Sequence, residues 1–369
     1  SSTSRGLGDV YKRQVFELPL KDYSNITIDW GDNSTSTHTD GAFPAHTYSA
    51  LNDNQTVTIT VTVNDAEKDI GEIYMNGDHP SSTLIRTITK WGEGKWESFY
   101  SAFNGATNLT IPATDEPDLS LTTSMELAFT SCTSLVGTTL NDWNVSTINN
   151  MRNMFQNATA FNQNIGNWNV SNVTNMEGMF ESAKAFNQDI GNWNIASVTN
   201  IRSMFAGANS FNQDIGNWDV SSVTNMGFVF QNVGSFNQDI GNWNTGAVTA
   251  IDSMFEGAAA FNGDIGNWNT AAVTNMQDMF FGATVFNQDI GNWNLSNVTT
   301  MRGMFNTAIA FNQNISSWNT ANVTNMNYLF TRATAFNQDI GNWDTSAVTN
   351  MQYMFCLLYT SPSPRDVEE

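Results

Sequence analysis

The sequence is poor in the residues that build reactive centres and disulfide frameworks. Its 369 residues include two cysteines and three histidines, and charged residues make up only 13 % of the chain. Two cysteines cannot form the framework of a disulfide-stabilised module, so stability has to come from a packed core. No Ser-His-Asp order, HExxH sequence or glycine-rich phosphate loop occurs, which argues against an enzyme.

Positive charge and long apolar runs are also scarce. The chain carries 14 basic and 35 acidic residues, which gives a net charge of -21. This balance argues against nucleic acid as a partner, because phosphate binding requires clustered Lys and Arg. No uninterrupted apolar run reaches the length of a membrane span, so we expect no membrane insertion in this sequence. The neutral Asn, Gln, Ser and Thr that dominate the polar residues favour an extracellular setting.

What the sequence does contain is a repeat of 25 residues. Tryptophan recurs at Trp143, Trp168, Trp193, Trp218, Trp243, Trp268, Trp293, Trp318 and Trp343, and phenylalanine from Phe155 to Phe355 at the same interval. A unit of this size cannot bury its own apolar face, so neighbouring units must stack and share a core. The repeat therefore predicts a solenoid.

Each unit predicts one short helix and one short strand. The helix is indicated by apolar residues at helical spacing, namely Val173, Met176, Met179, Phe180, Ala183 and Phe186. The segment 187–193 predicts the strand, which is expected to pair in parallel with its copies. Glycine recurs at 166, 191, 216, 241, 266, 291 and 341, which suggests a bend in the backbone. The expected fold class is an α/β solenoid with a strand and a helix in every coil.

The chain divides into five segments. Residues 1–14 and 356–369 resemble a translated sequencing-adapter oligonucleotide, so we expect the natural chain to continue beyond both. Residues 15–90 are rich in β-branched and aromatic runs and predict a small β-domain. Residues 91–142 contain degenerate repeats that lead into and cap the solenoid, and residues 143–355 form its regular part.

The β-domain resembles a known module. The run from Ile28 to Asn33, Ile-Asp-Trp-Gly-Asp-Asn, is followed by His46-Thr47-Tyr48 and a Val/Thr strand. This arrangement is similar to the polycystic-kidney-disease (PKD) type β-sandwich, which implies an immunoglobulin-like fold. Asp32 and His46 suggest a metal site or an acid–base pair, but both fall in expected turns, which favours a structural role.

The repeats resemble a second family. The pattern Ala-Phe-x-x-[AC]-x-x-Leu occurs at 102–109 and 128–135, and the later units read Met-Phe-x-x-Ala-x-x-Phe-Asn-x-x-Ile-x-x-Trp. These sequences resemble BspA-type leucine-rich repeats, and the 25–26-residue form is similar to the surface-protein repeat of Listeria-, Bacteroidetes- and Mycoplasma-type lipoproteins. The resemblance implies a secreted or surface-attached protein, in several cases an adhesin, with no shared catalytic residues.

One column of carboxylates is a candidate metal site. Stacking the coils aligns Asp189, Asp214, Asp239, Asp264, Asp289 and Asp339, with Asn164 and Asn314 at the same place in other units. Neighbouring carboxylates about 5 Å apart repel by roughly 1 kcal/mol even in water, so something must offset this. Bound Ca²⁺ is one explanation. The other, which the Asn substitutions favour, is that each side chain accepts a backbone hydrogen bond.

The remaining columns favour structural roles. Asn at 162, 187, 212, 237, 262, 287, 312 and 337 predicts an amide ladder rather than a sugar site. The Trp and Met columns are expected to be core, and Cys132 replaces a core alanine and should be a buried thiol. One position varies freely and is expected to face solvent, namely Arg152, Glu177, Arg202, Gly227, Asp252, Gln277, Arg302, Asn327 and Gln352.

These observations lead to a functional expectation. We expect a secreted or cell-surface protein without catalytic activity that mediates adhesion or binds an extracellular protein or glycan through a repeated face. No cofactor is expected apart from the calcium alternative. Two alternatives remain. The chain is a structural spacer that carries a further domain, or it is the non-catalytic part of a larger secreted enzyme.

Overall fold

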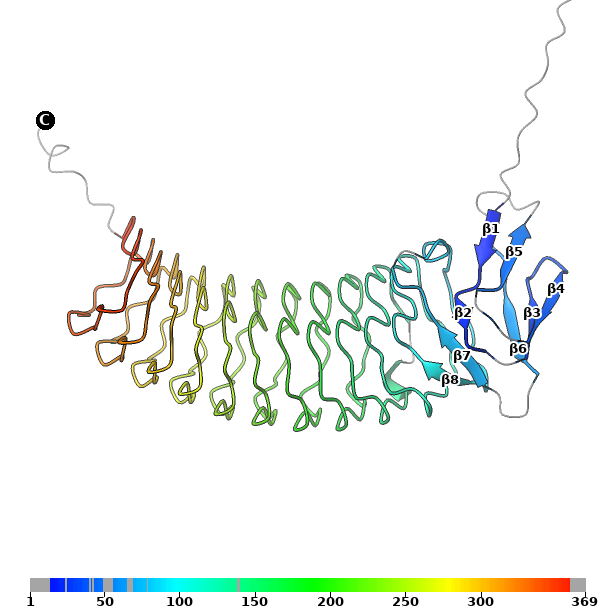
Figure 1. Ribbon diagram of the computed structural model, residues 1–369, viewed down its shortest axis with the longest axis horizontal. Coiled ribbons are helices and arrows are strands. Elements are labelled where there is room, and N and C mark those ends of the chain that lie inside the picture. Colours follow the sequence, from blue (N-terminus) through cyan, green and yellow to red (C-terminus); the bar gives the residue numbers. More distant parts are fainter. Residues whose placement is uncertain are drawn as a thin grey trace, which may run out of the picture.

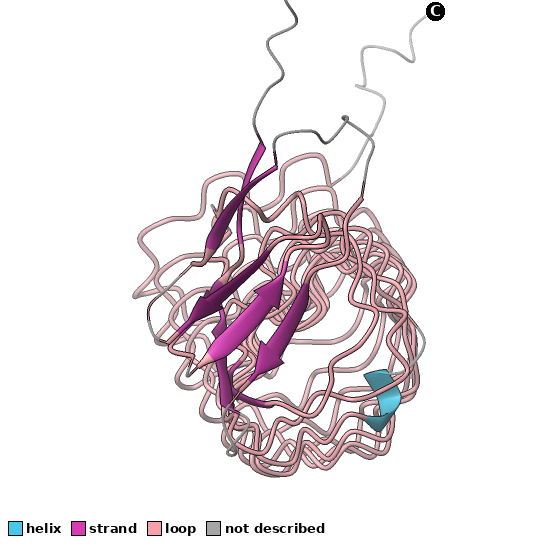
Figure 2. Ribbon diagram, turned by 90° about the vertical axis from the view of Figure 1, so that its right-hand side faces the viewer, coloured by secondary structure: helices cyan, strands magenta, loops and turns pink. Residues whose placement is uncertain are grey.

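The computed structural model describes residues 14–358, apart from 24, 40, 42, 49–55, 65–68, 78, 138 and 139. Short β-strands gather at the N-terminal end, and an elongated, gently curved stack of coils follows (Figure 1). Seen along its length, successive coils superimpose (Figure 2). Most of the two terminal segments that the sequence marks as foreign lies outside the described residues.

The N-terminal region consists of three small sheets. β1 pairs with β5, β3 lies between β4 and β6, and β7 lies between β2 and β8. The strands are β1 Gln14–Glu17, β2 Leu20–Lys21, β3 Ile26–Asp29, β4 Thr35–His38, β5 Ala45–Tyr48, β6 Thr60–Val63, β7 Asp69–Ile73 and β8 Lys95–Ser98. The predicted β character of this region is thereby confirmed.

β3 shows why these residues form strands. Ile26 and Ile28 are completely buried, whereas Asp29 between Ile28 and the buried Trp30 is exposed. This alternation is the period of two that a half-buried strand requires.

The sheet that contains β7 joins the two regions. β7 pairs in parallel with β8, and Lys95 of β8 pairs in parallel with Asp118 of the next coil. On its other side, β7 is covered by the antiparallel strand β2. β2 and β7 therefore close the N-terminal end of the stack.

The coils are held together by a ladder of backbone hydrogen bonds. Each coil forms one parallel bridge with the next, as between Asn150 and Asn175. Beyond this bridge, alternate amides donate to the following coil: Met151 N to Asn175 O, Asn153 N to Glu177 O and Phe155 N to Met179 O, at 2.8–3.0 Å. The amides in between bond within their own coil, as Met154 N does to Met151 O.

The α/β fold class was wrong, because the coils contain no α-helix. Among the described residues the one helix is a 3-10 turn at Leu140–Asp142. The segment that the spacing predicted as helical is a series of overlapping turns, in which Gly178 and Ser182 adopt φ values of 59° and 57°. An α-helix needs every amide to bond four residues back. Here half of the amides bond to the neighbouring coil instead.

The expected strand at 187–193 was also wrong, since no regular strand forms there. Parallel pairing does occur, but as the single bridge at Asn175 and its equivalents, which lies within the segment predicted to be helical. Tandem turns bury residues three and four apart, as a helix does, so their apolar spacing does not distinguish the two.

The core is built from columns of identical side chains. Phe155, Phe180 and their equivalents up to Phe330 are completely buried, and the rings of successive coils lie 5.6–6.0 Å apart. Within a coil, Phe180 stacks on Phe186 at 3.9 Å. Such aromatic pairs contribute about 0.5–1.5 kcal/mol each beyond the burial of their area.

The tryptophan and methionine columns are core, as predicted. Trp168 to Trp318 are at most 4 % exposed, and Met176, Met226 and Ile201 are completely buried. From Trp168 to Trp343 each indole also satisfies its N–H across coils, as Trp193 Nε1 does by donating to Ile165 O at 3.1 Å. A column that buries its rings and uses its N–H groups in this way cannot serve as a glycan-stacking platform.

The recurrent glycine has a different cause from the expected bend. Gly216 has an ordinary φ, but a Cβ built on it would lie 2.4 Å from the carbonyl oxygen of Asp239 in the next coil. The glycine column therefore exists because the backbones of adjacent coils approach closely.

We expect Gly216→Ala to lower the free energy of unfolding by about 1–3 kcal/mol, because a backbone carbonyl must move to make room. Gly234→Ala is the matched control, since a Cβ there meets no atom within 4 Å. Urea unfolding of both variants tests this. Equal stability of the two variants would contradict the close-approach explanation.

Candidate binding surface

Because the core columns are buried and use their polar groups within the stack, candidate functional residues are those whose side chains point outward from the coils. Four outward columns run along the stack, and a fifth cluster lies in the β-region. Each column occupies the same position in successive coils. The chemistry of a column therefore depends on the groups that neighbouring coils place beside it.

The aspartate column is used for backbone capping. Asp189, Asp214, Asp239, Asp264, Asp289 and Asp339 are exposed, and each accepts a hydrogen bond on Oδ1 from the glycine amide two residues later, at 2.8–3.0 Å. Asn164 and Asn314 make the same bond, to Gly166 and Ser316. An amide oxygen replaces a carboxylate oxygen without loss, which is the behaviour that the hydrogen-bonding alternative predicts.

The calcium hypothesis receives no geometric support. Within the described part of the chain, no group of three or more His, Cys, Asp or Glu side chains comes together in a way that could hold a metal ion. Calcium takes six to eight oxygen ligands. The calcium site stays a prediction, and no step of the functional argument rests on it.

The asparagine column is the predicted amide ladder. Asn162 Oδ1 accepts from the backbone amide of Asn187 at 2.9 Å and from Gln188 Nε2 at 3.0 Å, one coil further on. The same pair of bonds recurs at Asn187, where Asn212 and Gln213 donate. The side-chain amides of this column are therefore used in hydrogen bonds within the scaffold.

A threonine column was missed by the sequence analysis. Thr199 is exposed, and both its amide and its Oγ1 donate to the carbonyl of Thr174 in the preceding coil, at 2.9 and 3.2 Å. The pattern continues along the stack to Thr349. The Val-Thr-Asn triplet, which recurs in most units, could have indicated this column from the sequence. The threonine hydroxyls are bonded within the stack, so this column is structural as well.

The freely varying position forms what we call the variable ridge, which comprises Arg152, Glu177, Arg202, Gly227, Asp252, Gln277, Arg302, Asn327 and Gln352. Its charges pair across coils. Arg152 Nη1 lies 3.0 Å from Glu126 Oε1, at the same place in the preceding coil, and Arg152 Nε lies 3.6 Å from Glu177 Oε2. The bond to Glu126 raises the pKa of Arg152, so this guanidinium stays charged.

One ridge pair spans two coils. Arg202 Nη1 lies 3.6 Å from Asp252 Oδ2. Gly227 stands between them, and a Cβ there would lie 2.7 Å from Arg202 Nη1 and 2.9 Å from Asp252 Oδ1. The missing side chain is therefore what lets the pair form.

The backbone beside the ridge is held in an unusual conformation. The residue that follows each ridge position has a positive φ, even where it is bulky, as at Phe228 with 62° and Tyr328 with 59°. For such residues this conformation costs about 1–2 kcal/mol. It persists because each amide bonds to the next coil, Phe228 N to Asp252 O and Tyr328 N to Gln352 O, both at 2.9 Å. The ridge is thus displayed by a rigid backbone.

A fourth ion pair joins Arg302 of the ridge to Asp278, the residue that follows a ridge position. Arg302 Nη1 lies 2.9 Å from Asp278 Oδ2. Burial raises the pKa of Asp278, and the cation of Arg302 opposes that shift. The three ridge arginines Arg152, Arg202 and Arg302 keep 35–42 % of their side chains exposed, so their outer N–H groups are accessible to a partner.

In the β-region, Asp32 and His46 do form a pair. His46 Nε2 lies 2.8 Å from Asp32 Oδ2, and hydrogen bonds from Ser34 and from His46 lower the pKa of Asp32 to about 2. The His46 ring stacks on Trp30 at 5.0 Å, and Tyr48 donates from its hydroxyl to Trp30 O at 2.8 Å. The pair fastens the turn between β3 and β4 to β5, as the structural alternative predicts.

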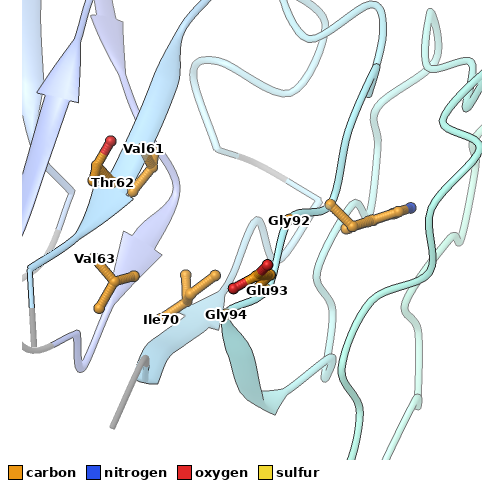
Figure 3. Close-up of a pocket in the computed structure, with 8 residues that line it drawn as sticks. Val61, Thr62, Val63, Ile70, Gly92, Glu93 and Gly94 are labelled. Atoms are coloured by element: carbon orange, nitrogen blue, oxygen red, sulfur yellow. The ribbon is translucent and has the colours of Figure 1, made fainter. Parts of the chain in front are cut away.

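A shallow hollow of about 250 Å³ lies where the β-region meets the coils. Val61, Thr62 and Val63 of β6 flank one side, and Ile70 and the loop Gly92-Glu93-Gly94 flank the other (Figure 3). Glu93 is the one ionisable side chain among its described lining residues. This arrangement offers no acid–base pair.

Two further findings concern Cys132 and the membrane. Cys132 is completely buried, its Sγ lies 3.1 Å from Phe103 O, and burial raises the pKa of the thiol. The predicted burial of the Cys132 thiol is thereby confirmed. Among the described residues, no helix has the length and apolar character needed to cross a membrane.

The capping role of the aspartate column can be tested directly. We expect Asp214→Asn to leave the free energy of unfolding unchanged, because the amide oxygen still accepts from Gly216. Asp214→Ala should lower it by about 1 kcal/mol, since the exposed amide then loses one hydrogen bond. Thermal unfolding with and without calcium is the measurement. Calcium-dependent stabilisation that Asp214→Asn removes would favour the metal site instead.

Comparison with known proteins identifies the repeats. The family described as "Mycoplasma protein of unknown function, DUF285" matches residues 123–238, 206–308 and 282–360. These overlapping stretches run from the last degenerate repeat to the final described coil and cover more than half of the chain. Neither a curated protein nor a solved structure matches it. The chain therefore belongs to this Mycoplasma-type family of repeat proteins, whose function is unknown.

Proposed function

We propose that this chain is a secreted or surface-attached repeat protein that binds an extracellular protein or glycan through the variable ridge and carries out no catalysis. The observation that carries the proposal is the contrast between the ridge and the four kinds of column described above. The core, aspartate, asparagine and threonine columns repeat almost unchanged and use their polar groups inside the scaffold. The ridge instead combines variable side chains with partly exposed arginines that are paired across coils.

The chemistry of the ridge is suited to recognition. Arg152 and Arg302 are each held by a carboxylate of a neighbouring coil, and Arg202 by a carboxylate two coils away. This pairing reduces the conformational entropy that they would lose on binding. A planar guanidinium that is half exposed can bond to carboxylates or hydroxyl oxygens of a partner. Arginine is also enriched among the residues that dominate binding energies.

The geometry favours an extended partner. Adjacent ridge positions belong to adjacent coils, so contacts are spread along the stack and not concentrated in a deep pocket. Several weak contacts of this kind combine through high effective concentration. The net charge of -21 makes a nucleic acid an unsuitable partner.

The resemblance of the repeats to BspA-type surface repeats supports an extracellular location. The resemblance of residues 15–90 to PKD-type modules also supports it. In this proposal the β-region closes the N-terminal end of the stack and the coils present the ridge.

The full chain, screened on arrays of glycans and extracellular-matrix proteins, tests the proposal. For any ligand found, we expect Arg152→Ala/Arg202→Ala to weaken binding at least about tenfold, since two exposed arginine contacts are lost. The melting temperature should change little, because exposed ion pairs contribute about 0–1 kcal/mol each. Arg302 is left in place, because burial already raises the pKa of its partner Asp278 and the cation of Arg302 opposes that shift.

The matched control is Thr199→Ala/Thr249→Ala, which alters the threonine column on other coils of the same stack. It should bind like the unaltered chain. If the threonine variant loses binding and the arginine variant retains it, the ridge is not the recognition surface.

A further inference from the structure

An accessible tyrosine stands where the column of the variable ridge enters the β-region. Tyr100 occupies the ridge position two coils before Arg152. The amide of the next residue, Ser101, donates to Glu126 O at 2.8 Å, and Ser101 has a φ of 55°, positive like that of the residue after every ridge position. The side chain of Tyr100 is 40 % exposed. The column that carries arginines along the stack therefore carries an aromatic ring before them.

The β-region holds this ring in place. Tyr100 stacks on Tyr74, with the ring centroids 6.1 Å apart and the planes at 22°. The Lys21 ammonium lies 4.4 Å from the centroid of the Tyr74 ring and 2.8 Å from Glu72 Oε2. Lys21 belongs to β2, Tyr74 follows β7 and Tyr100 follows β8. Because β7 lies between β2 and β8, Lys21 and Tyr100 approach Tyr74 from opposite sides. A ring fixed in this way loses little conformational freedom when a ligand packs against it.

The polar groups that follow Tyr100 in the column point away from it. Glu126 directs its two carboxylate oxygens onward, to Asn150 Nδ2 at 2.8 Å and to Arg152 Nη1 at 3.0 Å. The guanidinium of Arg152 is 41 % exposed. Neighbouring backbones in parallel pairing lie about 5 Å apart, which is close to the width of a sugar ring. The exposed tyrosine is thus followed, one and two coils further on, by a carboxylate and a guanidinium.

This combination of groups suits a pyranose sugar. A pyranose has a face of C–H groups, which packs on the electron-rich face of an aromatic ring. Its rim of hydroxyls can donate to a carboxylate and accept from a guanidinium. The pairs Lys21–Glu72 and Glu126–Arg152 each combine one cation with one anion. The site therefore has no excess of charge that would select a charged peptide, and an uncharged ligand rich in hydroxyls fits it better.

We propose that Tyr100, Glu126 and Arg152 form a binding site for a neutral polysaccharide. One sugar stacks on Tyr100, and its hydroxyls bond to the carboxylate and the guanidinium. The sugars that follow it lie along the variable ridge, where contacts from successive coils add to the first. This inference rests on the proposed function, because the site continues the ridge, and it narrows the ligand to a glycan without charge.

Native affinity electrophoresis of the full chain tests the proposal, in gels that contain an amylose, a mixed-linkage β-glucan or a galactomannan. We expect at least one of them to retard the protein. Tyr100→Ala should weaken this binding at least about tenfold, because the stacking contact is lost. Tyr100→Phe keeps the ring and should retain most of the retardation. The control Val136→Ala, at a 48 % exposed apolar residue elsewhere on the coils before residue 143, should bind like the unaltered chain. Circular dichroism shows whether the three variants are folded.

Three results would overturn the proposal. The first is retardation by none of the three polysaccharides at their highest soluble concentrations. The second is retardation that Tyr100→Ala leaves unchanged. The third is loss of binding to a matrix protein, and to no polysaccharide, in Tyr100→Ala, since this would assign the ring to a protein partner. If Arg152→Ala/Arg202→Ala still weakens binding of a ligand found on the arrays, the proposed function stands and only the tyrosine site fails.

Discussion

The ladder of backbone hydrogen bonds between coils is the interaction on which the rest of the structure depends. Alternate amides of a coil, such as those of Met151, Asn153 and Phe155, donate to the next coil and leave the others to close turns within it. This division prevents a helix and forces left-handed residues at regular intervals. The same division brings the backbones so close at the corner that glycine stands there in every regular coil from 166 to 341 except the one with Ser316. It also sets the spacing at which the phenylalanine rings stack.

Because of this ladder, the residues that stabilise the fold are different from the ridge residues that we propose to bind a partner. Core packing and backbone pairing fix the position of every coil, so the polar columns that support the corners have little freedom to vary. The ridge contributes almost nothing to this scaffold, and its side chains can change from arginine to glycine without disturbing the core. A protein built in this way can alter what it binds while its fold stays constant, as expected for repeat proteins with an extended binding face.

Much of the core was predictable from sequence, but the backbone conformation was not. The 25-residue period, the buried tryptophan and methionine columns and the buried Cys132 follow from recurrence alone. The helix expected from Val173 to Phe186 fails because tandem turns give the same apolar spacing, and nothing in Phe228 or Tyr328 indicates a positive φ. The alternating charges of Glu126, Arg152 and Glu177 were an available indication of ion pairing that the sequence analysis did not use. The Arg202–Asp252 pair depends on the space above Gly227 and had no such indication.

The most direct test is native-state hydrogen exchange on Phe230→Ala, which removes one ring from the middle of the stack. Such a deletion costs about 3–5 kcal/mol when the ring is fully buried. If coils are stable only through their neighbours, the amides of Phe205 and Phe230, which bond towards the coils that follow them, should both lose protection. Loss confined to the altered coil, with full protection retained on either side, would contradict the account.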